Sequence, residues 1–167
     1  MENKIENFTK IRADGNIIYD YMSVTDIKWE PCKIQTVEWE YDGRLVRFDE
    51  TPETGIAATF LKDKDIVVFA QTVGEKEAYN NLTVYNPDGT VRFTIPNKIL
   101  IFGEEKEGEF LWLPDSKYVD ANHFVVIFAP FDSNRVFKIL VNSDTGETEF
   151  LSEARQKMRL WKTELRV

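Results

Sequence analysis

The sequence predicts a mainly β fold, either an antiparallel β-sandwich or a strongly curved sheet like part of a propeller, built from hairpins. Short runs of β-branched and aromatic residues recur along the chain between turn residues. The turn signals are Asp14-Gly15, Asp42-Gly43, Asp88-Gly89 and Asp144-Thr145-Gly146. The chain has 167 residues, 43% of them hydrophobic. This length and composition suit a single compact domain spanning residues 1–167.

Two of these turns predict hairpins in residue detail. Asp-Gly supplies the positive φ angles that tight hairpin turns need. At Asp88-Gly89 the preceding Pro87 presets the first turn angle, so we expect a type I turn followed by a G1 bulge. The predicted cross-strand pairs are Trp39 with Val46, Val37 with Phe48, Glu38 with Arg47, Tyr85 with Val91, and Thr83 with Phe93.

Further strands are expected where apolar runs lie between turn signals. Phe124–Phe128 is apolar at every position, which predicts a central strand covered on both faces. The other expected strands are Asn16–Met22, Ile56–Leu61, Ile66–Gln71, Lys98–Phe102, Glu109–Leu113, Phe124–Ala129, Val136–Asn142 and Glu147–Leu151.

One segment, Leu151–Leu165, has a helical pattern. Its apolar residues from Ala154 to Leu165 recur at spacings of 4, 3 and 4, which places them on one helical face. The sequence therefore predicts a short C-terminal helix. A strand over Met158–Val167 is the alternative.

The net charge of −8 is unevenly distributed. Glu153–Val167 has five basic and two acidic residues, so this tail carries +3 and the rest of the chain −11. An acidic body repels phosphate backbones and anionic membranes and attracts a basic partner, so neither nucleic acid nor a membrane is expected as a partner. Met1–Lys10 lacks the apolar run of a signal peptide, and the lone Cys32 cannot form an internal disulfide. We therefore expect a cytoplasmic location.

The sequence offers little for catalysis. His123 is the only histidine, so any Ser-His-Asp or Cys-His arrangement would have to use it. Cys32 is expected to be buried and inert. Glu38 and Glu40 would lie about 6.8 Å apart along one strand, a separation that suits an inverting glycosidase, but Arg47 opposite favours an ordinary solvated face. We expect no catalytic residue, no metal site and no cofactor.

Two acidic segments are the candidate binding site for a partner. One lies between two predicted strands, and the other follows a predicted strand. Loops on a rigid sheet commonly display recognition sites. The candidate partner-binding residues are Glu104, Glu105, Glu107, Glu109, Asp49, Glu50 and Glu53.

In size, acidity, aromatic-rich β patterning and lack of catalytic groups, the chain resembles the immunity proteins of bacterial contact-dependent growth inhibition and related polymorphic toxin systems. The resemblance implies a non-enzymatic cytoplasmic protein that binds and neutralises one cognate toxin domain, often a basic nuclease. It covers general character rather than a motif, so it assigns no residue a role. Two alternatives remain: a β-barrel or sandwich that binds a small ligand, and a carbohydrate-processing enzyme that uses Glu38 and Glu40.

Overall fold

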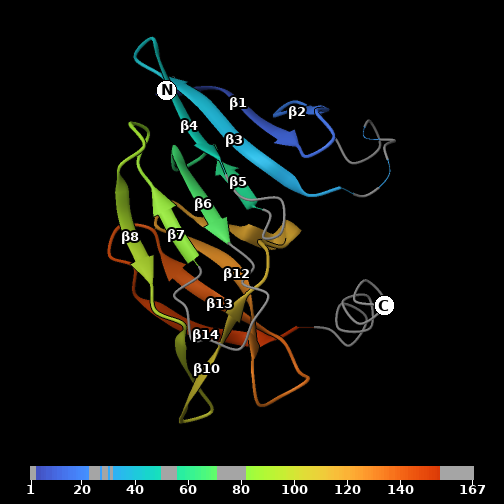
Figure 1. Cartoon of the computed structure of the whole chain (residues 1–167). Coiled ribbons are helices and arrows are strands. Elements are labelled where there is room, and N and C mark those ends of the chain that lie inside the picture. Colours follow the sequence, from blue (N-terminus) through green and yellow to red (C-terminus); the bar gives the residue numbers. More distant parts are fainter. Residues whose placement is uncertain are drawn as a thin grey trace.

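The computed structural model describes residues 3–22, 27, 30, 32–49, 56–70 and 82–154. Within these residues the chain forms antiparallel strands and one three-residue 3-10 turn, so the predicted mainly β fold class is confirmed (Figure 1). The strands form three sheets that follow one another along the chain and lie one above another. The described part contains no helix with the length and hydropathy of a membrane span.

The first sheet has the strand order β2-β1-β3-β4. Its hairpin turns at Asp42 and Gly43, whose φ angles of 49° and 74° suit a two-residue turn. All three cross-strand pairs predicted around this turn are present. The strands are β1 (Ile5–Arg12), β2 (Ile17–Tyr19), β3 (Ile34–Tyr41) and β4 (Arg44–Asp49).

The second sheet is a meander with the order β5-β6-β7-β8. Its last turn is the predicted type I turn with a bulge: Gly89 has a φ of 87° and donates its N–H to Asn86 O, while the N–H of Asn86 donates to Thr90 O. The strands are β5 (Ala57–Leu61), β6 (Ile66–Ala70), β7 (Leu82–Tyr85) and β8 (Val91–Ile95).

The bulge decides the register of this hairpin. The predicted pair of Tyr85 with Val91 is confirmed. The predicted pair of Thr83 with Phe93 is wrong, because the register shifts by one residue at Tyr85 and Thr83 faces Thr94 instead. An extra residue on one strand moves every later pair, so this error follows from the bulge itself.

The third sheet is strongly curved, with the order β14-β13-β12-β10-β9, and its first and last strands approach each other. The predicted central strand Phe124–Phe128 lies within β12, between β10 and β13. The elements are β9 (Lys98–Ile101), β10 (Glu104–Phe110), the 3-10 turn η1 (Asp115–Lys117), β11 (Tyr118–Asp120), β12 (His123–Pro130), β13 (Phe137–Asn142) and β14 (Thr148–Glu153). The short β11 pairs with one end of β12.

The second sheet is the middle layer, since both of its faces are covered. Every residue of β6 is buried. Its Val67 and Phe69 pack with Phe8 and Trp39 of the first sheet. Its Ile66, Val68 and Ala70 pack against the inner face of the third sheet. Alternate side chains of one continuous apolar strand therefore supply two cores.

Two sequence predictions about the third sheet are wrong. Residues Glu104–Glu109 form part of β10 rather than a loop, because Phe102-Gly103 makes the turn and pairs them with β9. The helix predicted from Leu151 does not begin there, since Leu151–Glu153 are the last residues of β14, and Ser152 and Glu153 pair with β13. The remainder of that predicted helix, Arg155–Leu165, lies outside the described residues.

Candidate functional site

The β9–β10 hairpin carries four of the predicted partner-binding carboxylates and ends in the two-residue turn Phe102-Gly103. These residues have φ angles of 51° and 82°. Glycine adopts this left-handed conformation freely, whereas a residue such as phenylalanine loses on the order of 1 kcal/mol there. Asparagine would suit the first position of this turn better. The turn therefore holds an aromatic side chain where local stability favours a small polar one.

The ring of Phe102 is exposed yet held in place. It is 68% exposed. Its centroid lies 5.0 Å from that of Phe150 and 6.3 Å from that of Phe137, and the Arg135 guanidinium lies 6.0 Å from it. Leu100, on the neighbouring strand, is 64% exposed. A supported aromatic ring that remains exposed is typical of an interface anchor, because little conformational entropy is lost on binding.

The hairpin carboxylates are partly neutralised by lysines of the same hairpin. Lys106 Nζ lies 3.1 Å from a carboxylate oxygen of Glu104, and Lys98 Nζ lies 3.7 Å from one of Glu107. Glu105 makes no ion pair within the described part of the chain.

The exposed charge of the hairpin is therefore only weakly negative. Three exposed carboxylates face two ammonium groups, which leaves a net charge of −1. The fourth predicted carboxylate, Glu109, is half-buried. Lys106 also contacts Asp132 across a turn, at 2.9 Å, and hydrogen bonds to Asp132 and Glu104 raise its pKa.

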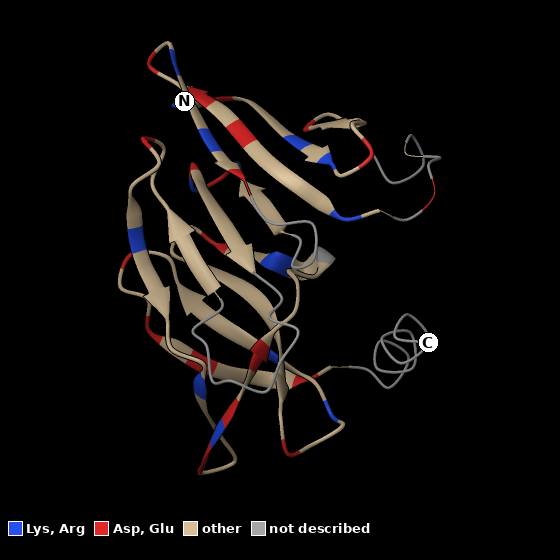
Figure 2. Ribbon diagram, viewed as in Figure 1, with Lys and Arg blue, Asp and Glu red and all other residues tan. Residues whose placement is uncertain are grey.

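The structure does not bring the second acidic segment to this hairpin. Asp49 ends β4 in the first sheet, whereas the β9–β10 hairpin belongs to the third sheet, with the second sheet between them (Figures 1 and 2). Its carboxylate accepts a hydrogen bond of 2.7 Å from Thr36 Oγ1, and with Arg47 this lowers its pKa. Glu50 and Glu53 lie outside the described residues. The seven candidate residues therefore do not form one surface.

The carboxylates considered for glycoside chemistry are engaged in structural contacts. Glu38 lies opposite Arg47, with 3.5 Å between carboxylate and guanidinium. Glu40 accepts a hydrogen bond of 2.7 Å from the Asn7 side chain. This arrangement matches a solvated strand face that is paired with its neighbours.

His123 and Cys32 were the other chemical candidates. His123 Nδ1 lies 2.9 Å from Asp120 Oδ1, and together with the backbone N–H of Asn122 this contact lowers the pKa of Asp120. Cys32 is exposed, so the expectation that it is buried is wrong. Among the described residues, no group of three or more His, Cys, Asp or Glu side chains could hold a metal ion.

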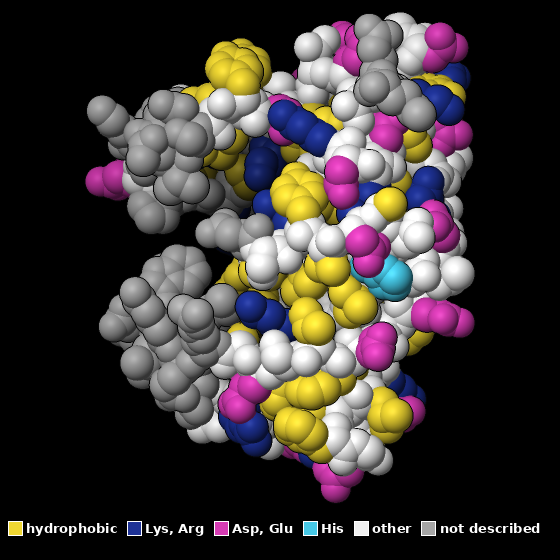
Figure 3. Space-filling view, turned by 180° about the vertical axis from the view of Figure 1, so that it is seen from behind, with side chains coloured by type: hydrophobic (Ala, Val, Ile, Leu, Met, Phe, Trp, Pro, Cys, Tyr) yellow, Lys and Arg dark blue, Asp and Glu magenta, His cyan; other side chains and the backbone are white. Residues whose placement is uncertain are grey.

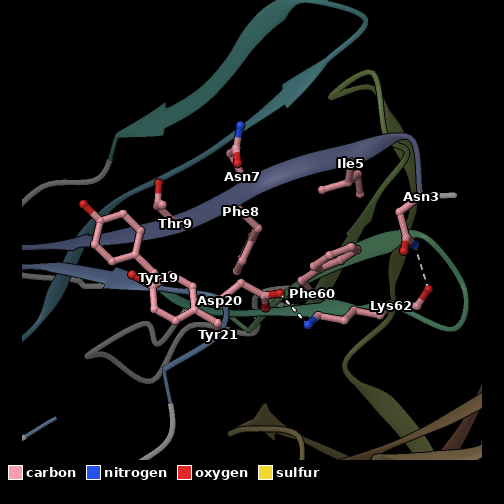
Figure 4. A pocket seen from close by; sticks show the side chains of 10 residues that line it. All are labelled: Asn3, Ile5, Asn7, Phe8, Thr9, Tyr19, Asp20, Tyr21, Phe60 and Lys62. Carbon is pink, nitrogen blue, oxygen red and sulfur yellow. Dashed lines mark hydrogen bonds and ion pairs between the residues drawn. The ribbon is translucent and has the colours of Figure 1, made fainter. Parts of the chain in front are cut away.

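A groove that the sequence did not predict runs between the first sheet and β5. It consists of two adjoining hollows of about 460 and 390 Å³ that share Phe8, Tyr19, Asp20, Phe60 and Lys62. Figure 4 shows the first hollow, with Asp20 and Lys62 paired beside the rings of Tyr19 and Tyr21. Seen from behind, the molecule is hollowed beside its grey atoms, and basic side chains lie there next to apolar ones (Figure 3).

Lysines from three separate elements line this groove. Lys10 of β1, Lys62 after β5 and Lys117 of η1 all border the second hollow. Lys62 Nζ lies 2.7 Å from Asp20, and this hydrogen bond raises the pKa of Lys62. Burial lowers the pKa of Lys10, despite the opposing effect of Asp20, and Lys117 lowers it further. Tyr118 is half-exposed beside them, and burial raises its pKa.

The two surfaces differ in how the sequence could have revealed them. Phe102-Gly103 lies between two β-prone runs, so its turn had a local signal that the acidic residues after it obscured. The groove lysines are separated by about fifty residues each, and no local pattern relates them. Their proximity depends on the stacking of the sheets.

No family model matches this chain, and no curated protein matches its sequence. Its fold is similar to that of a chain in a solved structure described as "Structure of Tne2 in complex with Tni2". The TM-score is 0.78, and the likeness covers 90% of this chain and 99% of that chain. The two sequences are 21% identical, so the likeness establishes the fold alone.

Proposed function

We propose that this protein is a non-enzymatic, cytoplasmic immunity protein that binds and neutralises a cognate toxin domain, a basic domain of the nuclease type. The observation that carries the proposal is the β9–β10 hairpin tip. There the strained and exposed Phe102 forms the turn between two strands that carry the exposed Leu100 and three exposed glutamates. Apolar anchors supply affinity, and the surrounding carboxylates steer a basic partner toward them.

The fold similarity supports a protein partner. The similar chain belongs to a structure of two proteins in complex, Tne2 and Tni2. A chain of this fold therefore takes part in a complex between two proteins. The acidic body of the present chain, with −11 on residues 1–152, adds long-range attraction toward a basic partner.

Phe102→Asn tests the anchor without disturbing the hairpin. Asparagine accepts the positive φ of this position, so we expect the melting temperature to stay unchanged or to rise. Loss of the aromatic anchor should weaken binding of the toxin domain encoded by the neighbouring gene by about 2 kcal/mol, near thirtyfold in Kd. Isothermal titration calorimetry and thermal unfolding measure the two effects. Leu45→Asn, at a 60% exposed position of β4, is the matched control.

The carboxylates are tested by reversing Glu104, Glu105 and Glu107 to lysine together. Steering by charge acts on the association rate, so the triple variant should associate more slowly and lose most of the salt dependence of its rate. Stopped-flow measurements with the same toxin domain across a salt series check this. Unchanged association in the triple variant, together with unchanged affinity in Phe102→Asn, would exclude the hairpin from the interface.

A further inference from the structure

The groove runs along β5, which is an edge strand of its sheet in the described part of the chain. This strand pairs with β6 on one side and ends its sheet on the other. Ile56 N–H donates to Ile34 O, and Ala58 C=O accepts from Lys10 Nζ at 3.2 Å, so both groups point away from β6. In an antiparallel ladder, every second residue points its N–H and C=O away from the neighbouring strand. The N–H and C=O of Phe60 therefore point away from β6, like the groups of Ile56 and Ala58. An extended segment could extend the sheet there.

The groove also holds ammonium groups that form no direct ion pair with any described residue. Lys62 is paired with Asp20. Within the described residues neither Lys10 nor Lys117 makes an ion pair with a carboxylate: Lys10 bonds the Ala58 carbonyl, and Lys117 Nζ lies 4.7 Å from the centre of the Tyr118 ring. Taking an ammonium group out of water without an opposite charge is unfavourable. A carboxylate placed between Lys10 and Lys117 would relieve that cost.

Exposed tyrosines form the rim of the groove. Tyr19, Tyr21 and Tyr118 are 41%, 79% and 48% exposed, and the first two rings stack with centroids 5.4 Å apart. Tyrosine is enriched at protein interfaces because its ring packs while its hydroxyl stays hydrated. A groove that is open along this rim suits an extended chain better than a small molecule, which binds with most of its surface enclosed.

We propose that this groove binds an extended acidic segment of the protein partner, with its backbone along the edge of β5 and a carboxylate between Lys10 and Lys117. The inference rests on the proposed function in that the partner is a protein. Such a partner carries a basic surface for the β9–β10 hairpin and an acidic segment for the groove. The second surface adds specificity, because a merely basic domain would fit the hairpin alone.

The test compares three lysine variants with two probes. The variants are Lys10→Met, Lys117→Met and the double variant, with Lys138→Met on β13 as the matched control. The probes are the toxin domain and a fluorescein-labelled pentapeptide, Val-Glu-Val-Glu-Val, with a lysine-for-glutamate peptide as its counterpart. We expect fluorescence anisotropy to show that the wild type binds the acidic peptide but not the basic one. The double variant should lose that binding and bind the toxin domain about tenfold more weakly.

The outcomes separate this inference from the proposed function. If the lysine variants bind the toxin domain like the wild type while Phe102→Asn does not, the groove proposal fails and the hairpin proposal stands. If no toxin domain binds the wild type, the proposed function fails, and the groove proposal fails with it as a partner site. Citrate binding as tightly as the acidic peptide, together with equal binding of the acidic and the basic peptide, would identify a small-anion site. That result would overturn the inference. Circular dichroism confirms that each variant is folded.

Discussion

The β9–β10 hairpin and the groove beside β5 are opposite in how they handle charge. The hairpin is acidic in sequence, yet Lys98 and Lys106 neutralise two of its three exposed carboxylates. The groove lies in an acidic protein, yet Lys10 and Lys117 keep their charges without a carboxylate partner in the described part of the chain. Ion pairing between neighbouring side chains therefore decides which charges of a surface remain unpaired.

The two surfaces also differ in what holds them. The hairpin is anchored by contacts within one sheet, where Phe102 rests on aromatic residues of β13 and β14. The groove is formed between sheets, by residues of β1, β2, β5 and η1. Loss of local packing should therefore affect the hairpin without changing the groove, and this difference can be tested.

The largest effect is expected from Gly108→Ala, which should dislodge the hairpin and spare the groove. A Cβ at Gly108 would lie 2.3 Å from Ala129 O and 2.7 Å from Pro130 Cα, both backbone atoms of β12. Strand β10 would have to move away, at a cost of about 3 kcal/mol in the free energy of unfolding. Urea unfolding measures the loss, with the exposed Glu105→Ala on the same strand as control. Retained binding of the acidic peptide would show that the groove is independent of the hairpin, and an unchanged unfolding midpoint would contradict the close approach.

A smaller effect, of opposite sign, is expected from Lys10→Met. Burial lowers the pKa of Lys10, which means that its ammonium form is disfavoured in the folded protein. The variant should be more stable than the wild type by about 1 kcal/mol while it loses peptide binding. If Lys10 instead stabilised the fold and took no part in binding, Lys10→Met would be less stable than the wild type and would still bind the peptide.

The same variant gives a pH test. Below the lowered folded-state pKa, both the folded and the unfolded wild type hold the Lys10 proton. As pH rises through the lowered folded-state pKa toward the ordinary value of 10.5, the folded protein releases the proton first. The wild type then gains stability relative to Lys10→Met, so the difference between them should shrink in this window. Chemical denaturation at a series of alkaline pH values checks it, and a constant difference would mean that Lys10 is not desolvated.

The smallest effects distinguish paired from unpaired carboxylates on the hairpin. Glu104→Lys removes the contact with Lys106 and brings two ammonium groups together, so the free energy of unfolding should fall by about 0.5 kcal/mol. Glu105→Lys breaks no ion pair within the described residues and should change it by no more than about 0.2 kcal/mol. Thermal unfolding at low salt measures the stability of both variants. Equal losses of stability would show that the ion pair of Glu104 does not contribute to the free energy of unfolding.

Much of the fold could be predicted because hairpins are local. Asp42-Gly43 and Asp88-Gly89 turn as their residue types require, and the alternation beside the first turn places Trp39 opposite Val46. The bulge after the second turn was predicted, but its consequence for Thr83 was not. At the candidate site, three of the four predicted glutamates of β10 are exposed, and Phe102, which was assigned to a strand, lies in a turn.

By itself, the sequence determined the β class, the main turns and the register near them, because each depends on residues a few positions apart. The stacked arrangement of the three sheets was decided only by tertiary structure. The gathering of Lys10, Lys62 and Lys117 was decided there too. These lysines come from the first sheet, the second sheet and η1, so they meet only when apolar faces far apart in the chain pack together. Burial and pairing then set their charge environment, and neither is a property of a single segment.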